Sequence, residues 1–179
     1  MDKFSLDTRT GLPEALRVLV QEYPRTGWQT HRNFNGLVQF WMERHMMFRQ
    51  LVTILTEDVQ ALSDRRMDHG RYAPRLSRFA GTLLNELHGH HGIEDHHYFP
   101  RLVRIDRRAE QGFALLDRDH HAMDGHLHAM AEAANAVLKG GEPGPFAERL
   151  DAFARMLNRH LDDEEDIVVP VILASGFQG

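Results

Sequence analysis

The sequence predicts an all-α fold, an antiparallel up-down-up-down four-helix bundle preceded by a short N-terminal segment. Three observations predict it. Four stretches of roughly 20 to 30 residues carry apolar side chains at helical spacing, Gly and Pro separate them, and no stretch alternates as a strand does. Each apolar stripe is too narrow to be buried except against the other stripes. We therefore expect residues 1–32 to form the N-terminal segment and residues 33–174 to form the bundle.

The N-terminal segment and the first bundle helix follow from local signals. A short helix is expected over residues 13–23, with Pro13 in its first turn, where a missing N–H costs nothing. The first bundle helix is expected over residues 33–63. A polar break over residues 64–74 follows, and Pro74 closes it.

The other three bundle helices are bounded by Pro and Gly. The second is expected over residues 75–98, because Pro100 cannot continue the hydrogen bonding of a helix interior. The third is expected over residues 109–139 and ends at a turn rich in Gly and Pro. The fourth is expected over residues 146–166, with Pro170 marking its end.

Composition narrows the class of protein. A chain of 179 residues with 42% apolar and 26% charged residues is typical of one globular domain. A net charge of −5 provides no positive field for nucleic acid or anionic lipid, and the absence of Cys excludes disulfides and thiol catalysis. The N-terminus has no apolar run that could be a signal peptide. We expect a cytoplasmic protein with no nucleic-acid or membrane partner.

Histidine is the outlier, because 13 residues are about three times the average usage. In the second predicted helix the apolar stripe continues into His90 and Glu94, which lie four residues apart on one face. In the fourth, His160 and Glu164 repeat this spacing, and each Glu has a Pro six residues later. The shared pattern indicates an internal repeat of one helical hairpin.

The first and third predicted helices also match, since His45 and His120 each follow two apolar residues and three mostly polar ones. In an antiparallel hairpin, two residues lie at one level when the turn falls midway between them. The midpoints between His45 and His90, His90 and His120, and His120 and His160 all fall in predicted breaks. The spacing therefore predicts that these imidazoles and carboxylates meet in one layer.

A metal pair explains such a layer, because a buried carboxylate loses several kcal/mol of solvation without a partner. Imidazole and carboxylate suit iron, manganese or zinc, and two bridging carboxylates hold two metals about 3.5–4 Å apart. We expect each metal to take two His, both Glu to bridge, and open positions to take water, hydroxide or an oxygen species. No catalytic residue is expected apart from the ligands. The predicted metal ligands are His45, His90, Glu94, His120, His160 and Glu164.

Residues near the predicted ligands are expected to support the metal site. Four are candidates for extra ligands or for hydrogen-bond partners of ligands, namely His91, His97, His121 and Asp124. Six are core residues that would also form a dry wall lining the metal pocket, namely Trp41, Phe48, Leu87, Met123, Met156 and Leu157. The acidic run at residues 162–166 is interpreted as a solvated helix end in which only Glu164 faces the stripe.

The stretch at residues 90–100, His-His-x-x-Glu-Asp-x-x-x-Phe-Pro, resembles the hemerythrin-like family, also called the HHE cation-binding domain. The resemblance extends over roughly residues 36–172, and the pattern returns at residues 160–170. It implies a left-handed four-helix bundle that holds a non-haem di-iron centre and binds or reacts with dioxygen, peroxide or nitric oxide. The expected cofactor is two non-haem iron ions, Fe2+ or Fe3+, able to carry an oxo or hydroxo bridge, with manganese or zinc as substitutes.

This sequence departs from the oxygen-carrying members, whose third helix has His-x-x-x-His and whose fourth ends in His and Asp. Here Asp124 follows His120 and Glu164 follows His160 at that spacing, so a fifth imidazole is missing and a carboxylate is added. A more negative site favours higher iron oxidation states. The chain is therefore similar to the branch associated with redox reaction, peroxide handling or iron and oxygen sensing.

Several functions remain open at this point. A di-iron protein could carry or sense dioxygen, or act as an oxidoreductase of the peroxidase, catalase, oxidase or oxygenase kind, including one that acts on a small organic substrate. Ferritin-like iron handling requires Glu-x-x-His, which Glu94 and His97 provide once, whereas Ile167 replaces the second His. The remaining alternative is a metal-free helical interaction module.

Overall fold

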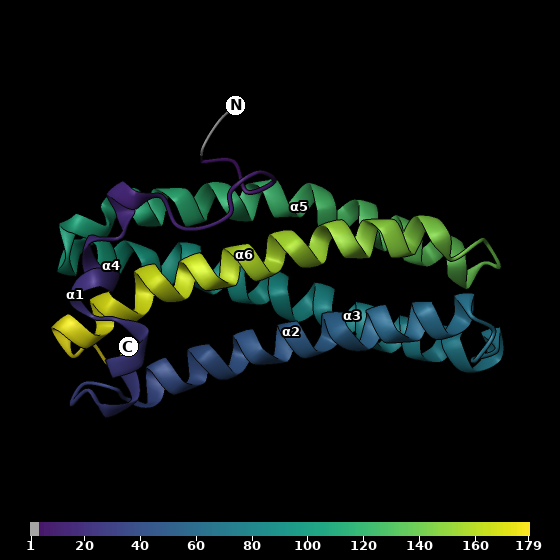
Figure 1. Ribbon diagram of the computed structural model, residues 1–179, viewed down its shortest axis with the longest axis horizontal. Coiled ribbons are helices and arrows are strands. Elements are labelled where there is room, and N and C mark those ends of the chain that lie inside the picture. Colours follow the sequence, from purple (N-terminus) through teal and green to yellow (C-terminus); the bar gives the residue numbers. More distant parts are fainter. Residues whose placement is uncertain (1–3) are drawn as a thin grey trace.

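The computed structural model describes residues 4–179, which contain helices and no strand. Four long helices, α2 (Gly36–Ser63), α3 (His69–Ile93), α5 (Glu110–Leu138) and α6 (Gly144–Ser175), lie alongside one another (Figure 1). Helix α2 packs on α3 and α6, and α5 packs on the same two helices, so α2 and α5 are diagonal. The predicted four-helix bundle is confirmed. None of the helices between residues 4 and 179 has the length and apolar character needed to cross a bilayer.

Caps set where the first two long helices begin. The Asn35 side chain accepts hydrogen bonds from the backbone N–H groups of Leu37 and Val38, which fixes the first turn of α2. The Asp68 side chain accepts from the Arg71 N–H and starts α3 at His69. The predicted start at residue 75 is therefore wrong, and Pro74 lies inside α3.

The second predicted helix does not stop before Pro100. A π-helical turn, η3 (Glu94–Tyr98), joins α3 to α4 (Phe99–Ile105), and the Phe99 N–H donates to the Glu94 carbonyl five residues earlier. Pro100 falls in the first turn of α4, where it needs no N–H partner. The His96 ring donates from Nδ1 to the Gly92 carbonyl at 2.8 Å and satisfies an acceptor beside the π turn.

The fourth helix also continues past its predicted end at residue 166. Pro170 is buried inside α6, within the apolar run Ile167 to Leu173, whose side chains are all buried. Burial of that run outweighs the backbone hydrogen bond that Pro170 cannot donate. The helix ends at Gly176, whose φ of 71° is left-handed and whose N–H caps the Ile172 carbonyl. By contrast, α5 agrees with the predicted range 109–139 to within one residue at each end.

The N-terminal segment is less regular than expected. The helix predicted over residues 13–23 is divided into a 3-10 turn, η1 (Glu14–Leu16), and a short helix, α1 (Val18–Glu22), and a second 3-10 turn, η2 (Arg25–Thr30), follows. Helix α1 packs against α6 at one end of the bundle. A last 3-10 turn, η4 (Arg107–Ala109), leads into α5.

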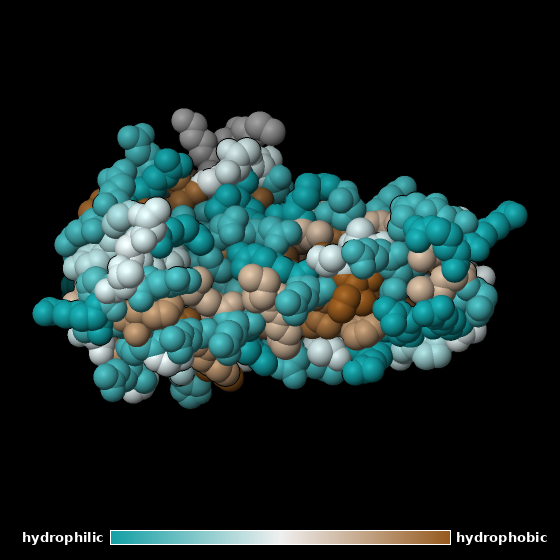
Figure 2. Space-filling view, turned by 60° about the horizontal axis from the view of Figure 1, so that its bottom comes forward, coloured by the Kyte–Doolittle hydropathy of each residue, from teal (hydrophilic) through white to brown (hydrophobic). Residues whose placement is uncertain are grey.

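The buried apolar residues form two separate clusters along the bundle. One, which includes Phe48, Leu83 and Phe153, fills the end that holds the α2–α3 and α5–α6 turns. The other, which includes Phe99, Phe113 and Val168, fills the opposite end beneath the N-terminal segment. Figure 2 shows a mostly hydrophilic surface interrupted by apolar patches. The layer between the two clusters is polar.

Candidate metal centre

The polar layer contains the six predicted ligands, which come from all four long helices and the π turn. His45 comes from α2, His90 from α3 and His120 from α5. Glu94 begins the π turn, and α6 supplies both His160 and Glu164. Five of the six side chains are buried, and His90 is nearly so. The structure thus brings the six residues together away from water.

One half of the layer consists of two imidazoles and two carboxylates. His45, His90, Glu94 and Glu164 each offer one ligand atom, and these atoms lie within 4.8 Å of one another. The Nε2 atoms of His45 and His90 are 3.3 Å apart. This spacing would let one metal ion contact both rings, so we call this group the two-histidine half-site.

The other half consists of three imidazoles, from His91, His120 and His160, whose ligand atoms also lie within 4.8 Å of one another. The Nε2 atoms of His120 and His160 are 3.2 Å apart. The His91 ring stacks on the His120 ring with centroids 3.9 Å apart and meets His160 edge-on. We call this group the three-histidine half-site.

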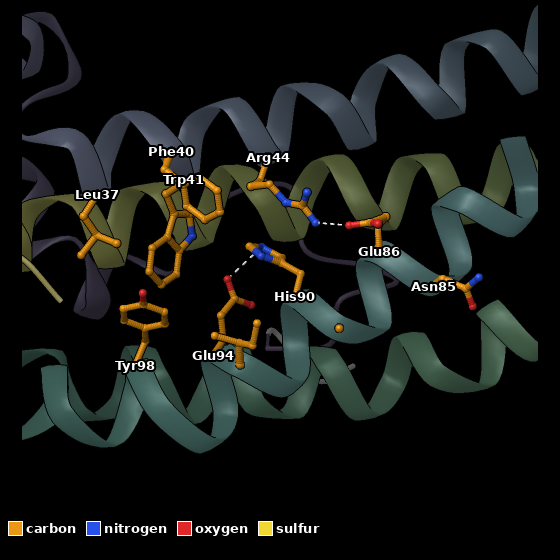
Figure 3. A pocket seen from close by; sticks show the side chains of 11 residues that line it. Leu37, Phe40, Trp41, Arg44, Asn85, Glu86, His90, Glu94 and Tyr98 are labelled. Atoms are coloured by element: carbon orange, nitrogen blue, oxygen red, sulfur yellow. Dashed lines mark hydrogen bonds and ion pairs between the residues drawn. The ribbon is translucent and has the colours of Figure 1, made fainter.

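Each buried glutamate lies between the two half-sites. Glu94 places Oε1 2.8 Å from Nε2 of His90 (Figure 3) and Oε2 3.6 Å from Nε2 of His120. Glu164 places Oε1 3.3 Å from Nε2 of His45 and Oε2 3.4 Å from Nε2 of His160. Each carboxylate therefore presents one oxygen to each half-site, the arrangement of a bridging ligand.

His91 corrects the expectation that the site lacks a fifth imidazole. The ring comes from α3, directly after His90, and not from the third bundle helix, where the oxygen carriers have theirs. The two halves of the site are therefore unequal in imidazoles. The expectation of two His for each metal does not describe this arrangement.

Unpaired polar atoms concentrate in this layer. Among residues 4–179, six buried side-chain nitrogen or oxygen atoms have no hydrogen-bond partner. Four of them belong to the layer, namely both oxygens of Glu94, Oε2 of Glu164 and Nε2 of His91. Leaving such atoms without a partner costs about 1–3 kcal/mol each, and more when they are charged. Bound cations would satisfy all four, so the donor set fits a metal pair.

The outer nitrogens of three imidazoles are held by carboxylates. His45 donates from Nδ1 to Glu165 at 3.0 Å, and His120 donates from Nδ1 to Asp95 at 2.8 Å. His160 donates from Nδ1 to Asp119 at 3.4 Å. Because Nδ1 of each ring is held by a carboxylate, Nε2 is the nitrogen that faces the centre of the layer and is the atom that a metal ion would contact.

Arginines in turn hold two of these carboxylates. Glu165 accepts from Arg49 at 2.9 Å and from Arg25 at 2.7 Å. Asp119 accepts two bonds from Arg9, a buried residue of the N-terminal segment. Arg9 also donates from Nε to Asp163 at 2.7 Å, so one guanidinium joins α5 to α6.

Sequence reasoning missed these partners. Asp95, Asp119 and Glu165 each adjoin a ligand in the sequence, which is the one signal that could have found them. The acidic run of α6 was interpreted as solvated apart from Glu164, and this is wrong for Asp163 and Glu165, which are both buried. Arg9, Arg25 and Arg49 come from distant parts of the chain, so no local pattern indicates them.

Burial and mutual contacts shift the pKa values of the layer in opposite directions. Burial lowers the pKa of His90 to about 3, although the charge of Glu164 opposes this. Burial also disfavours protonated His160, but hydrogen bonds to Asp119 and Glu164 outweigh it and raise that pKa to about 9. Burial and the charge of Glu164 raise the pKa of Glu94 well above its usual value. A cation must therefore displace protons from His160 and Glu94.

Three of the four secondary candidates lie outside the layer. His97, His121 and Asp124 are exposed, and His121 bonds the Asp117 carbonyl of its own helix. The π turn carries His97 to the surface, although it lies seven residues after His90. The Glu-x-x-His arrangement of a ferritin-like site is therefore not formed by Glu94 and His97.

The six residues expected to form an apolar wall around the metals belong to the buried core. The six expected wall residues, Trp41, Phe48, Leu87, Met123, Met156 and Leu157, are all buried. Trp41 also has a polar role, because its indole N–H donates to Oε1 of Glu164. Phe48 packs on His90 with ring centroids 5.2 Å apart. The Trp41 indole thus fixes the orientation of the Glu164 carboxylate.

Comparison with protein families identifies a match over most of the chain. Residues 36–172 match the family described as hemerythrin HHE cation binding domain. The match begins at the first residue of α2 and ends three residues before the end of α6. Comparisons with curated proteins and with solved structures gave no match.

Proposed function

Because the chain belongs to the hemerythrin HHE cation-binding domain family, we propose that it is a non-haem di-iron protein that binds, senses or reduces dioxygen, peroxide or nitric oxide. One observation carries the proposal. Glu94 and Glu164 each direct one carboxylate oxygen to the two-histidine half-site and the other oxygen to the three-histidine half-site. The two groups of imidazoles therefore share both carboxylates. Two metals held in this way lie close enough to react with one small molecule.

The donor chemistry supports iron. The seven candidate ligands offer imidazole nitrogen and carboxylate oxygen, and the chain has no Cys to supply a thiolate. Imidazole with carboxylate suits iron, manganese and zinc, whereas thiolate-rich sites favour zinc and iron–sulfur clusters. A bound iron pair would supply electrons to dioxygen, peroxide or nitric oxide.

The protein's own groups prepare the site for this chemistry. The carboxylates of Glu165, Asp95 and Asp119 keep the imidazole lone pairs directed inward, which preorganises the ligands. The two-histidine half-site has one imidazole fewer than the other, so it leaves more coordination positions open for an external ligand.

Metal analysis tests the proposal. Protein expressed with added iron should contain about two irons per chain, with a near-ultraviolet absorption band that changes on reduction by dithionite and returns in air. His90→Ala and Glu164→Ala should each remove most of the metal. The exposed His128→Ala is the matched control and should retain it. Unchanged metal content in both site variants, or one tightly held zinc per chain, would overturn the proposal.

Assays on the iron-loaded protein distinguish an enzyme from a carrier or sensor. An enzyme would turn over hydrogen peroxide, or oxidise an added organic reductant, at a rate that depends on bound iron. A carrier or sensor would form a stable oxygenated spectrum that reverses under vacuum. The candidate ligand set of five imidazoles and two carboxylates suits either mode, so these two measurements decide between them.

A further inference from the structure

A cavity of about 420 Å³ opens between α2 and α3 beside the two-histidine half-site. Figure 3 shows its lining side chains approaching from both helices. Leu37, Phe40 and Trp41 come from α2, Ile93 comes from the end of α3, and Tyr98 comes from the π turn. His90 and Glu94, two candidate ligands of that half-site, also line it. The cavity therefore leads from the surface to the half-site with more open positions.

The cavity is larger than the proposed gaseous or peroxide ligands need. A water molecule takes about 30 Å³ of liquid volume, and dioxygen and peroxide are only slightly larger. A cavity of about 150 Å³ holds one benzene molecule. The space here is nearly three times that volume, which suits an organic molecule of one or two rings.

Its lining indicates the chemical class of the occupant. Trp41 and Tyr98 present aromatic rings that meet edge-on with centroids 5.0 Å apart. The charged side chains on the other side, Arg44 and Glu86, form an ion pair with each other across the cavity (Figure 3). Their charges compensate, so the cavity offers no unpaired charge at that end to an ionic ligand. A flat, neutral, largely apolar molecule fits these walls.

We propose that this cavity is a binding site for a neutral aromatic molecule of one or two rings, held between α2 and α3 beside His90. Its use as a substrate site rests on the proposed function, because only a reactive metal pair would transform the molecule. Binding itself depends on the cavity alone.

Gly89 provides a way to fill the cavity without replacing a candidate ligand. Gly89 lines the cavity, and a Cβ added there meets no atom within 4 Å. Gly81 is a matched control, because it lies on the same helix, has the same open space for a Cβ and does not line the cavity. Leu is a better helix former than Gly, so neither substitution weakens the helical preference of α3.

The experiment titrates 2-naphthol into the full-length protein by calorimetry, in the metal-free and iron-loaded forms. Saturable binding with one site per chain is expected in both forms. Gly89→Leu should weaken it at least tenfold, and Gly81→Leu should leave it within twofold. The anion 2-naphthoate should bind at least tenfold more weakly than 2-naphthol.

Each other outcome contradicts the proposal. Equal affinity of Gly89→Leu and Gly81→Leu for 2-naphthol would place the binding site elsewhere. Tighter binding of 2-naphthoate than of 2-naphthol would show that the cavity does not prefer a neutral ligand. No saturable binding of 2-naphthol to the metal-free or the iron-loaded protein would reject the site. Iron content measured on the same samples separates the two proposals. A chain that binds 2-naphthol at this cavity but takes up no iron would retain the site and reject the di-iron function.

Discussion

At the scale of single residues, the internal repeat predicted six candidate ligands that the structure brings into one layer, and it did not indicate His91, which breaks the repeat. In the internal repeat His91 is equivalent to Leu161, so the repeat does not predict a ligand at residue 91. Adjacent helical residues point about 100° apart, which prevents His90 and His91 from sharing one narrow stripe. The layer is wide enough to take both, because each ring faces a different half-site. Only the three-dimensional packing of α3 on α5 reveals this.

His91→Ala should therefore remove one metal and leave the other. The variant loses one of three imidazoles in the three-histidine half-site and none in the two-histidine half-site. Metal content should fall from about two irons per chain towards one, measured by plasma mass spectrometry after gel filtration. His121→Ala, at the exposed residue that directly follows His120, should keep two. Full retention of metal by His91→Ala would remove it from the ligand set.

Glu165 should make stability depend on pH. Burial opposes its ionisation, but the hydrogen bond from His45 and the charge of Arg49 outweigh burial and lower the pKa of Glu165 to about 2. A carboxyl whose pKa falls on folding stabilises the protein above its ordinary pKa, and that stabilisation disappears as the pH falls towards the lowered value. The shift corresponds to about 3 kcal/mol at neutral pH.

Glu165→Gln should accordingly lower the free energy of unfolding of the metal-free protein by up to about 3 kcal/mol at pH 7. The difference from the parent protein should shrink progressively below about pH 4.5, because a protonated Glu and a Gln are both neutral. Urea unfolding at several pH values between 7 and 3 measures it. A difference that stays constant over this range would show that Glu165 acts by packing and not by charge.

At the scale of elements, Gly and Pro predicted the four long helices but placed some of their ends wrongly. Pro100 and Pro170 were interpreted as stops, yet a π turn accommodates the first and a buried apolar run retains the second. The predicted start of α3 is too late, because the Asp68 cap begins the helix before Pro74, at which the predicted break ends. A single Pro removes one hydrogen bond, and tertiary packing can outweigh that loss. The positions of Gly, Pro and apolar residues therefore predict where the long helices lie more accurately than where they begin and end.

The N-terminal segment acts on the site through Arg9, and its removal should be costly. Arg9→Ala leaves the buried carboxylates of Asp119 and Asp163 without their shared guanidinium. Breaking a buried ion pair in this way costs about 3–5 kcal/mol. Thermal and urea unfolding of the metal-free protein should show that loss. Arg155→Ala, which breaks an exposed pair with Asp151, should cost less than about 1 kcal/mol. Equal effects of the two variants would contradict a structural role for Arg9.

At the scale of the whole molecule, the bundle consists of two apolar clusters separated by a polar layer. The clusters are stabilised by apolar burial, whereas the layer holds carboxylates and imidazoles that need cations. The sequence predicted this arrangement, because hydrophobic periodicity and the His and Glu repeat define the clusters and the layer independently. It could not predict how the N-terminal segment covers one end.

Metal removal should therefore lower the melting temperature markedly. A ligand at about 1,000 times its dissociation constant stabilises the folded state by about 4 kcal/mol per site. In a chain of this size 1 kcal/mol corresponds to about 2–4 °C, so stripping two metals should lower Tm by roughly 15 °C or more. Scanning calorimetry before and after treatment with EDTA measures the change. An unchanged Tm would instead favour a metal-free helical interaction module.

The shared carboxylates affect how strongly the two helical hairpins of the bundle associate. Glu94 belongs to the hairpin of α2 and α3, and Glu164 belongs to the hairpin of α5 and α6, yet each reaches imidazoles of the other hairpin. Neither hairpin carries a complete half-site. Bound metal would thus link the two hairpins reversibly. If the chain is cut in the connection between α4 and α5, the two fragments still share both apolar clusters, and they should associate more tightly on gel filtration when iron is present than after EDTA is added.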